Sequence, residues 1–156
     1  MFGVGKIRFA PGSFGSLVTV IILFYLFHII NISSSIILFG LVIIFIYSFY
    51  AITTHTADIK DKDPGEIVID EFLGQSIPIY LYETSHGATN DFSEAIIYYG
   101  LFFLLFRYFD IAKPFPVNFF DKNFKNSFGV IMDDICAGLY VVLTVVCFVN
   151  IKDYFL

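Results

Sequence analysis

The stretch GVIMDDICAGLYVVLTVVCFVN, residues 129–150, joins two adjacent aspartates, Asp133 and Asp134, to a long apolar run. A run of this composition is typical of a membrane helix, in which a charged side chain is costly unless it has a partner or a function. Ala137 and Gly138 follow one turn after the aspartates, and residues this small allow a second helix to approach closely. The stretch therefore predicts a membrane helix with acids beside a close helix contact.

A second stretch, DPGEIVIDEFLGQ at residues 63–75, has the same character. Glu66 and Asp70 are four residues apart and would share one face of a helix, with Glu71 on the adjacent stripe. Gly74 lies one turn beyond Asp70, so this helix can also approach a neighbour closely. We expect the two acidic helices to pack against each other.

The composition indicates an integral membrane protein with a single domain over residues 1–156. Hydrophobic residues make up 58% of the chain, and the mean hydropathy is +0.81. Five apolar segments predict an all-α bundle of about four to five membrane helices. Acids and Pro78 interrupt the third segment, so it either spans the membrane or lies partly at the interface. The segments are residues 16–31, 35–53, 67–82, 95–109 and 135–150.

Positive residues gather on one side of this topology. If all five segments cross and the N-terminus is cytoplasmic, only Lys152 falls outside, while the loop at residues 83–94 contains no Lys or Arg. This asymmetry follows the positive-inside rule. It brings both acidic stretches, APGSFGS at 10–16 and RYFDIAKPFP at 107–116 to the cytoplasmic face. The positive residues on that side are Lys6, Arg8, Lys60, Lys62, Arg107, Lys113, Lys122 and Lys125.

The grouped acids predict a magnesium site. Carboxylate oxygens suit Mg²⁺, and one or two carboxylates are enough to hold it. Two like charges as close as Asp133 and Asp134 repel unless a cation lies between them or one is protonated. The alternative is that the acids only decorate two helix N-termini, where the helix dipole favours them. The predicted ligands are Glu66, Asp70, Glu71, Asp133 and Asp134.

Basic residues near these acids predict phosphate binding. Arg107, Asp110 and Lys113 are spaced by three toward the end of the fourth segment, which Pro114 stops. Arg presents a planar fork to phosphate oxygens, and backbone N–H groups of the glycine-rich stretch at 10–16 could cradle an anion. A positive flank that stops membrane transfer would explain the basic residues but not Asp110. The predicted phosphate-binding residues are Arg107, Lys113, Ser13 and Ser16.

Other functional classes fit the sequence less well. A nucleic-acid partner is disfavoured because the chain has no basic stripe to neutralise phosphates. A small ion or proton transporter would also use intramembrane acids, but these acids gather at one mouth instead of spreading through the membrane. A structural subunit would leave the placed charges unexplained. Homo-oligomerisation is compatible with the sequence.

The motifs together resemble the phosphatidylglycerophosphatase A family of bacterial membrane lipid phosphatases. The resemblance covers nearly the whole chain and rests on APGSFGS, DPGEIVIDEFLGQ, RYFDIAKPFPVNFFD and SFGVIMDDICAGLY, in that order. It implies Mg²⁺-dependent hydrolysis of phosphatidylglycerophosphate to phosphatidylglycerol and inorganic phosphate in phospholipid biosynthesis. The site would face the cytoplasm from the inner membrane. The expected catalytic residues are Asp70, Glu71, Asp110 and Asp134.

Overall fold

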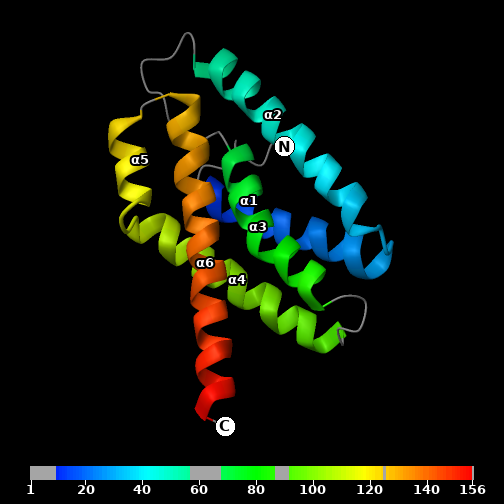
Figure 1. Cartoon of the computed structure of the whole chain (residues 1–156). Coiled ribbons are helices and arrows are strands. Elements are labelled where there is room, and N and C mark those ends of the chain that lie inside the picture. Colours follow the sequence, from blue (N-terminus) through cyan, green and yellow to red (C-terminus); the bar gives the residue numbers. More distant parts are fainter. Residues whose placement is uncertain (1–9, 57–67, 87–91, 125, 156) are drawn as a thin grey trace.

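The computed structural model describes residues 10–56, 68–86, 92–124 and 126–155, which are helical apart from short connections (Figure 1). The prediction of an all-α bundle is confirmed. The helices are α1 (Pro11–Phe24), continued by the π-helix η2 (Tyr25–Ile29), α2 (Ser34–Thr56), α3 (Ile69–His86), α4 (Phe92–Ala112), α5 (Val117–Asn123) and α6 (Ser127–Phe155).

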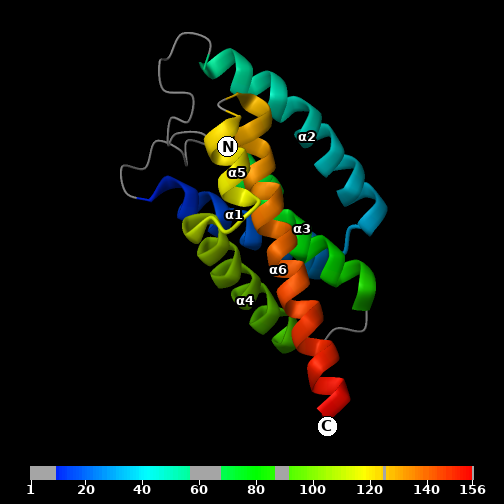
Figure 2. The same ribbon diagram turned by 60° about the vertical axis from the view of Figure 1, so that its left-hand side comes forward.

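Four helical segments in the described part of the chain are long and apolar enough to cross a membrane, namely residues 11–29, 34–54, 92–112 and 127–151. α3 is not among them, and it carries Asp70, Glu71 and Glu83. It instead contacts α1, α2, α4 and α6 and forms the centre of the bundle (Figures 1 and 2). Its acids can be tolerated there because neighbouring helices shield α3 from lipid.

The helices α3 and α6 touch backbone to backbone. A Cβ atom added to Gly74 would collide with the carbonyl group of Asp134, and one added to Gly138 would collide with the carbonyl oxygen of Gly74. Pro78 lies inside α3 and lacks the N–H that would otherwise bond the Gly74 carbonyl, which leaves this oxygen facing α6. The predicted close approach of the two acidic helices is confirmed.

α6 begins at Ser127, earlier than the apolar segment that we drew from residue 135. Asn126 accounts for this start, because its side-chain Oδ1 accepts a 3.0 Å hydrogen bond from the N–H of Gly129, as an N-cap residue does. Asn126 and Ser127 therefore mark the start of α6, which the hydropathy of the sequence alone did not reveal.

The early start of α6 changes the setting of Asp133 and Asp134. Both lie about two turns inside the helix, beyond the first turn in which the helix dipole favours acids. The alternative that they merely decorate a helix N-terminus is therefore wrong for this pair. Asp70 and Glu71 do lie in the first turn of α3, so the dipole contributes to their placement.

At the opposite end of the bundle, Glu83 connects three helical segments. Its Oε1 accepts a hydrogen bond from the Tyr99 hydroxyl at 3.0 Å and lies 3.0 Å from Nε2 of His28. The three residues belong to η2, α3 and α4. A connected polar group of this kind holds η2, α3 and α4 together at the end of the bundle away from the predicted site.

We expect Gly138→Ala to destabilise the protein by about 1–3 kcal/mol, because the added methyl group would push α6 away from the α3 backbone. Gly100→Ala is the matched control, since a Cβ atom there meets nothing within 4 Å. Alanine favours a helix by up to about 1 kcal/mol over glycine, so the control should unfold at the same or a higher temperature. Thermal unfolding in detergent measures both variants, and equal midpoints would contradict the backbone contact.

Candidate active site

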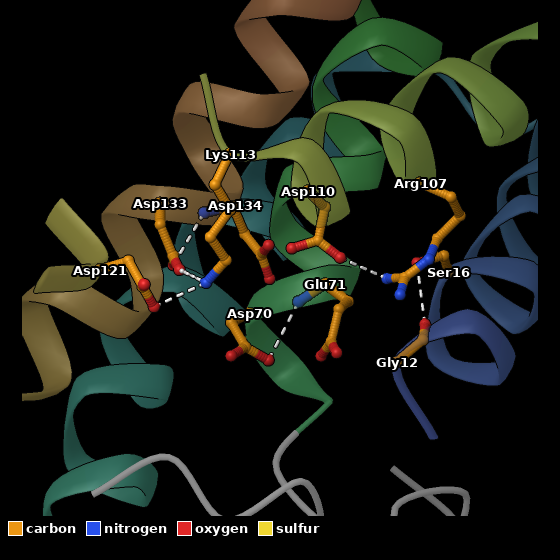
Figure 3. Close-up of polar contacts among 10 residues, drawn as sticks. All are labelled: Gly12, Ser16, Asp70, Glu71, Arg107, Asp110, Lys113, Asp121, Asp133 and Asp134. Carbon is orange, nitrogen blue, oxygen red and sulfur yellow. Dashed lines mark hydrogen bonds and ion pairs between the residues drawn. The ribbon is translucent and has the colours of Figure 1, made fainter. Parts of the chain in front are cut away.

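Polar side chains from α3, α4, α5 and α6 converge on one site (Figure 3). The contact between α3 and α6 explains part of this convergence. Asp70 lies one turn before Gly74 on α3, and Asp134 lies one turn before Gly138 on α6, so each carboxylate shares a face with the glycine at the contact. The close approach of the two backbones thus brings acids from distant stretches together.

Asp70, Glu71 and Asp134 form the centre of the site. Each offers one carboxylate oxygen, and these three atoms lie within 4.8 Å of one another. Asp70 and Asp134 are buried, and so is Oε2 of Glu71, which has no hydrogen-bond partner in the described part of the chain. Glu66, the other ligand predicted from this stretch, lies outside the described residues.

No basic side chain among the described residues forms an ion pair with these three acids. Buried anions at this separation repel one another, so a cation or bound protons must offset their charge. The buried Glu71 oxygen without a partner and the all-carboxylate donor set fit Mg²⁺, which prefers oxygen ligands. Of the predicted ligands, Asp70, Glu71 and Asp134 are therefore brought together.

Asp133 faces a different neighbour. Its Oδ2 accepts a 3.1 Å hydrogen bond from Nζ of Lys113, and the same ammonium group donates to Oδ1 of Asp121 at 2.6 Å. Burial lowers the pKa of Lys113, but the hydrogen bond to Asp121 and the charge of Asp133 outweigh burial and raise this pKa above its ordinary value. Lys113 is thus a permanently charged link between α5 and α6.

The backbone explains why Lys113 leaves the face expected from its spacing. α4 ends at Ala112, and Lys113 adopts a left-handed φ of 45° before Pro114. The side chain therefore does not continue the row of Arg107 and Asp110. Asp121 was missed as a site residue, although it closes the motif RYFDIAKPFPVNFFD, because the short helix α5 has no long hydrophobic period to reveal which face is inward.

Arg107 and Asp110 lie on the other side of the three acids (Figure 3). Nη1 of Arg107 is 2.6 Å from Oδ2 of Asp110, which holds the guanidinium in place. Nε of Arg107 is buried and has no hydrogen-bond partner within the described ranges, so it can donate to an added anion. A Cβ atom at Gly12 would collide with the Glu71 carboxylate and crowd Arg107, so a glycine lets α1 approach here.

The glycine-rich stretch is itself helical from Pro11 and forms the first turns of α1. The Ser16 hydroxyl donates to the carbonyl of Gly12 at 2.9 Å, and the N–H of Ser13 donates to the carbonyl of Ala10 at 3.0 Å. These donors are already used within the chain. The predicted phosphate binding by Ser13 and Ser16 stays a prediction, and the geometry adds no support to it.

Comparison with known proteins agrees with these motifs. The family model for phosphatidylglycerophosphatase A matches residues 1–149. Phosphatidylglycerophosphatase A of Haemophilus influenzae is 37% identical over 144 residues, which are 92% of this chain and 82% of that protein. Phosphatidylglycerophosphatase A of Escherichia coli is 31% identical over 140 residues, with coverage of 88% and 73%.

A third relative carries a different name. The putative phosphatidylinositol-3-phosphatase of Bacteroides thetaiotaomicron is 34% identical over 140 residues, which are 89% of this chain and 83% of that protein. No solved structure matches the chain. The family match over nearly the whole sequence, together with the converging acids, shows that the chain belongs to the phosphatidylglycerophosphatase A family.

Proposed function

We propose that this protein hydrolyses the phosphomonoester of phosphatidylglycerophosphate to give phosphatidylglycerol and inorganic phosphate, as a step of phospholipid biosynthesis. Family membership supports the reaction, and two relatives are named for it. The observation that carries the proposal is the group of three carboxylates, Asp70, Glu71 and Asp134, with Arg107 beside them. A centre of this kind can bind a cation and a phosphate together.

Mg²⁺ is the proposed cofactor, and Asp70, Glu71 and Asp134 would hold it. When bound, Mg²⁺ supplies positive charge that neutralises phosphate oxygens and favours the ionised form of a nearby water molecule. Asp133 contributes indirectly, because its hydrogen bond to Lys113 fixes the part of α6 that carries Asp134.

The remaining polar residues have distinct proposed roles. Arg107 binds the non-bridging phosphate oxygens, and its ion pair with Asp110 sets the direction of the guanidinium. Asp110 is not needed to hold the cation, so its carboxylate can accept a proton from the attacking water or return one to the departing glycerol oxygen. Lys113 positions α5 and adds positive charge near the phosphate.

We place the site at the cytoplasmic face of the bacterial inner membrane. α3 runs from Asp70 at the site to Glu83 at the far end, so it passes through the bundle as the four candidate spans do. With all five crossings the positive residues of the sequence gather on the side of the site. The transporter alternative would use the same acids to pass an ion. These acids gather at one end of the bundle, and at the far end Glu83 is hydrogen-bonded to Tyr99. This distribution favours a site at the membrane surface.

Asp70→Asn and Asp134→Asn should each lower kcat for phosphate release by a factor on the order of 10²–10³, because each removes a charge that supports the transition state. The measurement is phosphate release by purified protein from phosphatidylglycerophosphate, with phosphatidylinositol 3-phosphate as a second lipid. Glu94→Gln, an exposed acid at the start of α4, is the control and should keep its activity. Near-normal turnover by either aspartate variant would remove that residue from the mechanism.

Removal of Mg²⁺ with a chelator should abolish phosphate release, and added Mg²⁺ should restore it. A second readout does not depend on turnover. Mg²⁺ should raise the unfolding temperature of the unaltered protein, because a ligand that binds only the folded state stabilises it. The same addition should leave Asp134→Asn nearly unchanged. An equal rise in both proteins would show that the cation binds elsewhere.

Arg107→Lys should raise KM about tenfold, because lysine keeps the charge but loses the planar fork that matches phosphate oxygens. Steady-state kinetics with phosphatidylglycerophosphate measure the change.

Sealed vesicles provide the test against transport, since an ion flux that persists without lipid substrate would favour the alternative function.

A further inference from the structure

The short helix α5 has an unusual distribution of apolar residues. Val117 points inward and is 0% exposed, whereas Phe119, two residues later and on the opposite face, is 45% exposed. Phe115, just before the helix, is 76% exposed. The exposed residues of α5 also include Lys122 and Asn123 at its end. Aromatic residues beside polar ones on a short helix are typical of a helix that lies at the membrane interface.

The exposed phenylalanines belong to a continuous cluster of rings. The ring centroids of Phe119 and Phe124 are 5.9 Å apart, and those of Phe124 and Phe128 are 5.7 Å apart. Phe128 is exposed on α6, one of the four candidate membrane spans, so the cluster continues onto a helix that is long and apolar enough to cross a membrane. We call this cluster the α5 aromatic patch, which consists of Phe115, Phe119, Phe120, Phe124 and Phe128. Phe115, Phe119 and Phe128 are its exposed members, whereas Phe120 also packs against the core of the bundle.

The inner side of α5 is attached to the site. Asp121 lies four residues after Val117, on the same face, and receives the hydrogen bond from Lys113. Lys113 also bonds Asp133, which precedes the central Asp134 in sequence. Lys113 therefore links α5, which carries the aromatic patch, to the part of α6 that carries Asp134. The length of α5, seven residues, is about 10 Å and too short to cross a membrane, so this helix would lie along the surface.

We propose that the α5 aromatic patch inserts into the leaflet that carries the site and is the docking surface for the acyl chains of the lipid substrate. The phosphate then reaches the carboxylates from the bilayer side while the chains stay against the phenylalanine rings. An interfacial helix typically carries phenylalanine on its apolar side and lysine on its polar side. The exposed Lys122 at the end of α5 fits this position at head-group level. This inference rests on the proposed function for the identity of the substrate.

The first test measures membrane contact without measuring activity. The chain contains no tryptophan, so Phe119→Trp places a single fluorescent reporter on the patch. In phosphatidylcholine vesicles whose acyl chains are brominated near the carbonyl end, this reporter should be quenched strongly. Phe148→Trp, at a 68% exposed position on α6, is the matched reference for a lipid-facing side chain.

Two results would overturn the inference. Quenching of the residue-119 reporter by aqueous iodide but not by brominated lipid would place α5 in water. Protection from both quenchers, with a dependence on the protein-to-lipid ratio, would show that a second copy of the chain covers the patch.

The second test measures selectivity for chain length. Phe119→Ser should lower the ratio of kcat/KM for dioleoyl phosphatidylglycerophosphate to kcat/KM for the dihexanoyl lipid by about tenfold, because only the long acyl chains would reach the phenylalanine ring and bury it. Phe115→Ser, at the more exposed position, should act in the same direction. Phe39→Ser, a 68% exposed position on α2, is the control and should leave the ratio unchanged.

The outcomes separate the two proposals. An unchanged ratio in both patch variants, with both lipids hydrolysed by the unaltered protein, would overturn the docking surface and leave the proposed function intact. If the unaltered protein releases no phosphate from either lipid, the proposed function fails, and the quenching experiment still decides whether α5 contacts the bilayer.

Discussion

The backbone contact between α3 and α6 is the constraint on which the rest of the structure depends. Gly74 and Gly138 leave no room for a side chain between the two helices. Asp70 and Asp134 each lie one turn before one of these glycines, so the contact that packs the bundle also sets the distance between the carboxylates. A larger residue at either glycine would separate the helices and the acids together. Packing and the chemistry of the site therefore have a common cause.

The charges around this contact are arranged in two groups. Arg107 pairs with Asp110, and Lys113 pairs with Asp121 and Asp133, so the outer acids have basic partners. The central acids have no such partner among the residues that the structure describes, which leaves a buried negative centre between two fixed positive groups. Such an arrangement favours a bound cation in the middle and a phosphate at its edge, because each then meets charge of the opposite sign.

The position of this centre at one end of the bundle suits a substrate that stays in the membrane. α5 lies between the polar site and the apolar surface of the bundle. Asp121 on its inner face accepts a hydrogen bond from Lys113, and its outer face carries exposed phenylalanines. On the proposed function, a lipid would need to move only its head group to reach the acids, while its chains remain in an apolar setting. This arrangement avoids the large cost of transferring two acyl chains into water.

The sequence by itself determined the class of protein, the apolar helices and the central acids, because hydropathy, charge and small-residue spacing are local properties of the chain. Adjacent residues point about 100° apart on a helix, so helix geometry alone gives the side chains of Asp133 and Asp134 different directions. Only the tertiary structure decided that Asp134 joins Asp70 and Glu71, that Asp133 turns to Lys113, and that Asp121 completes this link. These outcomes depend on where each helix begins and on which neighbour its faces meet. The Asn126 cap determines where α6 begins, and the left-handed backbone of Lys113 determines where its side chain points. The hydrophobic periodicity of the sequence contains no information about either.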